Sequence, residues 1–174
     1  FNNYYKDWPQ KYIIDRGEWA TPANYALLFK YFIQDIKIIF LLRNPIDVIK
    51  SYIKLCNDHP NFYINRQYNE LDITSLHRTE LEDKKNVYFV KYEDLVENPK
   101  QILKGIYDFL DIPAFKHSFN IKNQFSINGI EYDDSVMGAP MHTLHTGKLK
   151  NFDYSDIKLP KYIIEKYKGV IYDY

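Results

Sequence analysis

The chain has 174 residues, about the size of one domain, and 45% of them are apolar and 17% aromatic, which is enough to fill a hydrophobic core. Its 23 basic and 23 acidic residues cancel, so no net charge draws it to nucleic acid or to a membrane, although a local anion site is still allowed. A single cysteine, Cys56, excludes an internal disulfide framework and a cysteine zinc cluster. The chain contains no apolar run of about 18 residues that would predict a membrane span, and no signal peptide is visible. The compartment therefore stays open, with the cytoplasm slightly favoured.

The first predicted elements are a short strand and a helix. Apolar residues at 12–14 predict a strand over Lys11–Asp15, which ends in the turn Asp-Arg-Gly-Glu. Thr21 and Pro22 then open a helix that extends to about Phe32, because apolar residues recur there at helical spacing. With the strand that follows, this order predicts a βαβ unit, a parallel sheet and a right-handed crossover.

The next stretch combines a strand with a helix N-terminus. Ile38–Leu42 is an unbroken apolar run, which is the pattern of a strand buried on both faces. Asn44 suits the N-cap of a helix, Pro45 suits its first position, and Asp47 stands where a capping box places an acid. Arg43 is thus expected at the carboxyl end of a parallel strand, beside a helix N-terminus, where α/β proteins bind anions.

The rest of the chain repeats this strand–helix order. A polar segment contains a helix predicted at about 65–82, and a strand is predicted at Val87–Lys91, ending in Tyr-Glu-Asp-Leu. An amphipathic helix follows Asn98-Pro99 and ends near Asp111. Residues from 115 to 134 lack a clean period and predict a loop with short elements, and a last helix is predicted at about 161–168.

The motif Arg-Asn-Pro-x-Asp-x-x-x-Ser at 43–51 resembles the 3′-phosphate-binding motif of sulfotransferases that use 3′-phosphoadenosine 5′-phosphosulfate (PAPS). In that family the arginine, and the serine eight residues later, hold the 3′-phosphate, which implies this role for Arg43 and Ser51. Taken singly, the two residues are also compatible with a surface arginine and a solvated helix serine. The strand followed by Tyr-Glu-Asp-Leu is similar to the family as well, where the tyrosine lies against the adenine, which implies that role for Tyr92.

A third similarity precedes the last helix. Thr146-Gly147-Lys148 resembles the basic, glycine-containing loop that closes over the nucleotide in sulfotransferases, although the usual arginine is absent. The resemblance implies that Lys148, and then Thr146, are nucleotide contacts. It also makes Arg16 and Glu18 the candidate catalytic residues, because the corresponding turn of the family often carries a cation or a base near the sulfonate. The alternative for these two is a solvated loop.

The resemblance covers most of the chain and implies an α/β fold of three layers, with a central parallel sheet flanked by helices, like that of the P-loop nucleoside triphosphatases. We expect residues 1–174 to form a single sulfotransferase-like domain. The family's N-terminal strand–loop–helix, which wraps the 5′-phosphosulfate, has no counterpart in the chain and is expected upstream of Phe1, together with the general base.

The implied reaction transfers a sulfonate from PAPS, as co-substrate, to a hydroxyl or amine of an acceptor that the sequence does not identify. Carbohydrate, peptide, lipid and small-alcohol acceptors all stay open. No metal and no nucleic acid are expected, although His142 and His145 could share one helix face as metal ligands. Two alternatives remain: a nucleotide kinase-like phosphoryl transferase, which needs a Walker-type loop, and a non-catalytic α/β nucleotide-binding or interaction module.

Overall fold

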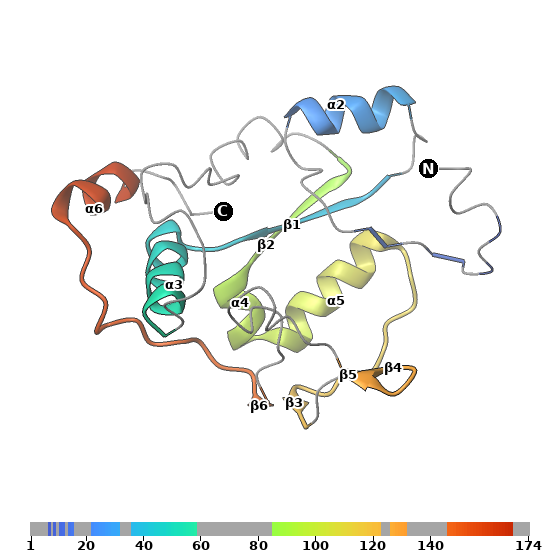
Figure 1. Cartoon of the computed structure of the whole chain (residues 1–174). Helices are drawn as coiled ribbons and strands as arrows, with labels where there is room; N and C mark the ends of the chain where they lie inside the picture. Colours follow the sequence, from blue (N-terminus) through green and yellow to red (C-terminus); the bar gives the residue numbers. More distant parts are fainter. Residues whose placement is uncertain are drawn as a thin grey trace. The chain divides into compact units, whose positions relative to one another are not determined.

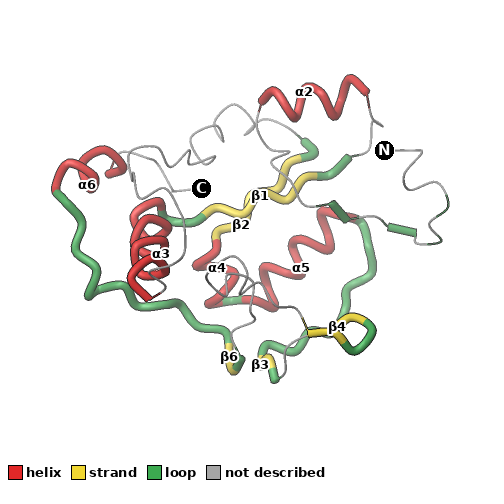
Figure 2. Tube along the Cα trace, viewed as in Figure 1, coloured by secondary structure: helices red, strands yellow, loops and turns green. Residues whose placement is uncertain are grey.

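A computed structural model describes residues 7, 9, 11–12, 14–15, 22–31, 36–58, 85–122, 126–131 and 146–168 (Figures 1 and 2). The chain divides into two compact units, one of residues 1–40 and 74–89 and the other of residues 41–73 and 90–174. Strands β1 (Ile38–Leu42) and β2 (Val87–Lys91) each pass from the first unit into the second. The two strands pair in a parallel sheet, which confirms that part of the prediction, but this pair is not the βαβ unit predicted from Lys11–Asp15 and Ile38–Leu42. The described structure is therefore a mixed α/β fold.

In the first unit, Asn86 joins three parts of the chain through its side chain and its backbone carbonyl. Helix α2 (Pro22–Tyr31) confirms the predicted helix over its described residues, and its Tyr25 hydroxyl donates a hydrogen bond of 2.6 Å to Asn86 Oδ1. Asn86 Nδ2 in turn donates to the Ile36 carbonyl at 3.0 Å, and the Asn86 carbonyl accepts from the Ile38 amide at 2.8 Å. One asparagine thus connects α2 to the beginning of both strands.

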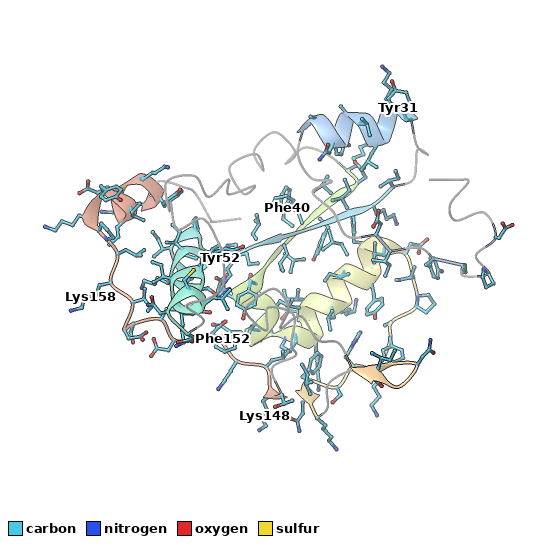
Figure 3. All side chains as sticks on the ribbon, viewed as in Figure 1. Tyr31, Phe40, Tyr52, Lys148, Phe152 and Lys158 are labelled. Carbon is cyan, nitrogen blue, oxygen red and sulfur yellow. The ribbon has the colours of Figure 1, made fainter. Side chains whose placement is uncertain are left out.

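Strand β1 buries one of its two faces. Ile38, Phe40 and Leu42 are buried, whereas Ile39 and Leu41 are 40% and 57% exposed. The prediction of burial on both faces is wrong here. Side chains alternate between the faces of a strand, so an unbroken apolar run shows that both faces are apolar but not that both are covered. On the buried face, the Phe40 ring meets the Phe89 ring of β2 edge to face, with centroids 5.5 Å apart (Figure 3 labels Phe40).

Two further predictions concern the strand near the N-terminus and the helix that follows α3. The strand predicted over Lys11–Asp15 is not formed at its described residues, where Tyr12 and Ile14 lie outside any strand and are 46% and 90% exposed. Three apolar residues alone do not make a strand. A strand also needs a neighbouring strand that pairs with its backbone N–H and C=O groups. The helix predicted at about 65–82 lies outside the described residues.

The core of the second unit lies between helices α3 (Pro45–Asp58) and α6 (Lys161–Lys168), which lie side by side in Figure 1. Ile49 and Ile163 are fully buried, and Tyr167 is 4% exposed. Partly buried apolar side chains pack around them, namely Ile46, Ile53 and Leu159. The final helix has the bounds that the sequence predicts.

Helix α4 (Tyr92–Glu97) begins directly after β2 and leads into α5 (Pro99–Leu110), which has proline at its start. Asp111 ends α5 in the left-handed conformation, with φ of 56°, and its amide bonds back to the last turn. Short strands follow: β3 (Asn120–Ile121), β4 (Ser126–Ile127), β5 (Ile130–Glu131) and β6 (Gly147–Lys148). Strands β4 and β5 form a hairpin, and β3 pairs antiparallel with β6.

We predict that Ile163→Ala lowers the free energy of unfolding by about 2–5 kcal/mol, because it leaves a cavity at a fully buried contact between α3 and α6. Ile164→Ala is the matched control, since the neighbouring isoleucine is 42% exposed. Urea unfolding measures both, and Ile163→Val, with an expected loss of about 0.5–1.5 kcal/mol, serves if the alanine variant does not fold. Equal losses for Ile163→Ala and Ile164→Ala would contradict this assignment of the core.

Candidate functional site

Asn44 begins helix α3 as the sequence predicts. Its side-chain Oδ1 accepts a hydrogen bond of 2.9 Å from the Ile46 amide, and its carbonyl accepts the Val48 amide at 3.0 Å. Pro45, at the first helical position, has no amide hydrogen to leave unpaired. Asn44 is therefore an N-cap with a satisfied side chain.

The acid that completes this cap comes from another part of the chain. The Asn44 amide donates to Glu93 Oε1 at 3.3 Å, although the sequence places Asp47 at the capping-box position. Glu93 belongs to α4, immediately after β2, so its carboxylate connects the turn after β1 to the turn after β2. The capping-box expectation for Asp47 is corrected accordingly, because a partner 49 residues away in sequence occupies the amide.

Arg43 occupies the turn between β1 and α3, and its guanidinium contacts two tyrosine rings. Its Cζ lies 4.4 Å from the centroid of the Tyr92 ring and 5.6 Å from that of Tyr154. Its Nη2 also donates to the Tyr154 hydroxyl at 3.3 Å. Both ring contacts are within the range of cation–π attraction. The structure thus brings together Arg43 and Tyr92, two of the residues that the sequence predicts for the nucleotide.

The Nε atom of Arg43 is buried and, among the described residues, has no hydrogen-bond acceptor. A buried donor without an acceptor costs about 1–3 kcal/mol, and more when the group is charged. A guanidinium presents its donors in a planar fork that matches the oxygens of a phosphate. The unsatisfied Nε therefore fits an anionic ligand at this turn.

Ser51 lies on α3 two turns after the N-cap and is partly buried. At 100° per residue, Ser51, Asp47 and Asn44 share the side of the helix opposite the buried Ile49. Ser51 thus faces away from the α3–α6 core, on the same side as the helix start. The structure is compatible with Arg43 and Ser51 acting on one ligand, and the distance from Ser51 to such a ligand stays a prediction.

The remaining predicted residues divide into two groups. Lys148, labelled in Figure 3, and Thr146 are exposed, and Lys148 is in β6, where it pairs in register with Asn120. Gly147 between them has φ of 99°, which glycine adopts without strain. Arg16 and Glu18 lie outside the described residues, as do the two histidines proposed as metal ligands, His142 and His145.

Comparison with known proteins identifies the family of the chain that contains the Arg43 turn. A model described as "Sulfotransferase family" matches residues 7–117, well over half of the chain. The chain belongs to the sulfotransferase family. The matched region contains Arg43, Ser51 and Tyr92, whereas Thr146 and Lys148 lie beyond it.

A solved structure gives independent support for the sulfotransferase fold. The chain is similar to a sulfotransferase domain from the curacin biosynthetic pathway, with a TM-score of 0.51 and 17% sequence identity. The match covers 96% of this chain and 58% of that one, so the chain spans little more than half the length of that domain. At this identity the likeness concerns the fold. No curated protein matches the chain.

Two features are absent from the described residues. No described helix is both long and apolar enough to cross a membrane. Across the same residues, no three side chains of histidine, cysteine, aspartate or glutamate gather as a metal-binding group.

Sequence reasoning did not identify Tyr154 or Glu93 as neighbours of Arg43 and Asn44. Glu93 carries a local signal, because it stands inside the Tyr-Glu-Asp-Leu motif directly after a predicted strand. Tyr154 carries none, since the chain has 17 tyrosines and this one is 111 residues from Arg43. Only the fold shows that it contacts the arginine.

We predict that Asn44→Ala lowers the free energy of unfolding by about 1 kcal/mol, because the Ile46 amide then loses its acceptor at the start of α3. Asn44→Ser is the control, since a serine hydroxyl can accept the same bond. Urea unfolding of the three proteins provides the measurement. A serine variant as unstable as the alanine variant would show that the cap bond is not the cause.

Proposed function

We propose that this sulfotransferase-family protein transfers a sulfonate group from PAPS to a hydroxyl or amine of its acceptor. The observation that carries the proposal is Arg43, which follows β1 and has a buried Nε without an acceptor in the part of the chain that the structure describes. A phosphate oxygen supplies both the negative charge and the acceptor that this donor requires. The 3′-phosphate distinguishes PAPS from common adenine nucleotides, so a site built around that group would select the sulfonate donor.

Side chains, more than backbone amides, would bind this phosphate. The cap of α3 already uses the amides of Asn44 and Ile46, and Pro45 has none. The N-terminus of α3 therefore contributes the field of its dipole, while Arg43 and Ser51 would contribute the hydrogen bonds. In this proposal Tyr92 contacts the adenine, and Thr146 and Lys148 add contacts to the nucleotide.

The chemistry assigned to the rest of the site is acid–base and electrostatic. The S–O bond to the 5′-phosphate breaks, a bond from sulfur to the acceptor oxygen or nitrogen forms, and the acceptor proton passes to a base. Fixed cations stabilise the charge that develops on the leaving phosphate. We assign Arg16 to this stabilisation and Glu18 to proton transfer as proposals from their position in the sequence.

We also propose that residues 1–174 form one sulfotransferase-like domain with a three-layer arrangement around a parallel sheet. Support comes from β1 and β2, each of which contributes residues to both compact units. A strand shared by two units makes independent folding of either unit unfavourable. The acceptor is left as a hydroxyl- or amine-bearing carbohydrate, peptide, lipid or small alcohol.

Calorimetric titration of the full-length protein tests the donor. We predict that adenosine 3′,5′-bisphosphate binds more tightly than 5′-AMP, and that Arg43→Ala weakens the bisphosphate about 10- to 100-fold, as expected when a bond to a charged group is lost. Arg43→Lys should restore only part of the affinity, because an ammonium cannot bind bidentately.

Lys100→Ala is the control for net charge, because it removes one exposed cation from α5 and should leave both affinities unchanged. Equal affinities of the wild-type protein for the two nucleotides would contradict the proposal. Equal and weak binding would favour a non-catalytic module, and preference for a nucleoside triphosphate would favour a kinase.

A further inference from the structure

Tyr154 contacts the predicted phosphate-binding arginine through both of its chemical features. Its hydroxyl accepts from Arg43 Nη2 at 3.3 Å, and its ring lies 5.6 Å from Arg43 Cζ. Tyr92 supplies the other ring contact, at 4.4 Å. We propose that Tyr154 is a positioning residue for the nucleotide site. It holds the Arg43 guanidinium in the orientation that receives the 3′-phosphate. This inference rests on the proposed function.

The backbone around Tyr154 is held by a local turn. The Ser155 amide donates to Asp153 Oδ1 at 2.8 Å, and the Ile157 amide donates to the Tyr154 carbonyl at 3.1 Å. The first bond makes an Asx turn, in which the aspartate side chain takes the place of a backbone acceptor. The Tyr154 backbone therefore takes part in two consecutive turns, and its side chain is partly buried.

The charge of one α3 residue acts on the same segment, and farther along the chain the segment packs against α3. Hydrogen bonds from Ser155 lower the pKa of the Asp153 carboxyl, and the charge of Lys50 on α3 lowers it further. Farther along the segment, Leu159 and Ile163 pack against the α3 core around Ile49. Because α3 begins beside Arg43, packing of this segment against α3 fixes the position of Tyr154 relative to the arginine.

A fixed guanidinium is an advantage for phosphate binding. A free arginine side chain must lose rotamer freedom when a ligand immobilises it, whereas one already held by its neighbours loses less. Tyr154 occupies Nη2 and one ring contact, which leaves the buried Nε without an acceptor among the described residues. Tyr154 thus acts on the phosphate through Arg43 and not by direct contact.

Two substitutions separate the ring from the hydroxyl. Tyr154→Phe keeps the ring and removes the acceptor of the Nη2 bond, while Tyr154→Ala removes both. Tyr162→Phe and Tyr162→Ala are the matched controls, because Tyr162 belongs to the same C-terminal segment and is 56% exposed. Urea unfolding of each variant reports whether a loss of binding comes from a loss of folded protein.

The measured quantity is the ratio of affinities for adenosine 3′,5′-bisphosphate and 5′-AMP, from calorimetry on the full-length protein. We predict that this ratio falls about 2- to 10-fold in Tyr154→Phe, as for one lost hydrogen bond. In Tyr154→Ala it should fall about 10- to 100-fold, since the cation–π contact is lost as well. Affinity for 5′-AMP, and both Tyr162 controls, should stay within about twofold of wild type, the smallest loss expected of one removed bond.

Three results would overturn the inference. The wild-type ratio could persist in both Tyr154 variants, or both nucleotides could weaken equally together with stability, which would make Tyr154 a structural residue only. A wild-type protein that shows no preference for the 3′-phosphate would overturn the proposed function and this inference with it. The first two results leave that function intact, so the two failures are distinguishable.

Discussion

The hydrogen-bonding demand of a single partly buried arginine organises the described site. Arg43 stands at the point where β1 ends and α3 begins, and its Nε is removed from solvent without an acceptor among the described residues. Two tyrosine rings and one hydroxyl hold the group in place. Tyr92 comes from the turn after β2, and Tyr154 supplies both the second ring and the hydroxyl from the C-terminal segment. The orientation of the arginine therefore depends on these two segments as well as on its own turn.

At the start of α3, backbone amide donors are already paired with acceptors from the protein. A helix N-terminus normally offers several unpaired amides to an anion. Here Asn44 satisfies one of them with its own side chain, and the carboxylate of Glu93 takes another. The consequence is a site in which backbone geometry is stabilised internally and side chains remain for the ligand. Binding through side chains also makes the site sensitive to the packing that positions them.

Sequence patterns succeeded where the determining interactions are local. The N-cap of α3, the proline at its first position and the end of α5 near Asp111 depend on residues within one or two turns of each other. The last helix, at Lys161–Lys168, follows from its own apolar spacing. Prediction was wrong where a neighbour decides the outcome: β1 is covered on one face only, and Tyr12 and Ile14 lie outside any strand.

The site divides in the same way. Neighbouring residues predict that an arginine follows an apolar strand and precedes a capped helix, and that a tyrosine follows a second strand, because the signals for strand ends and helix starts are local. The folded chain was needed to show that Glu93, and not Asp47, accepts from the Asn44 amide and that Tyr154 contacts Arg43. These partners are 49 and 111 residues distant in the chain. Contacts across such separations arise from packing, and no local pattern of charge or hydrophobicity encodes them.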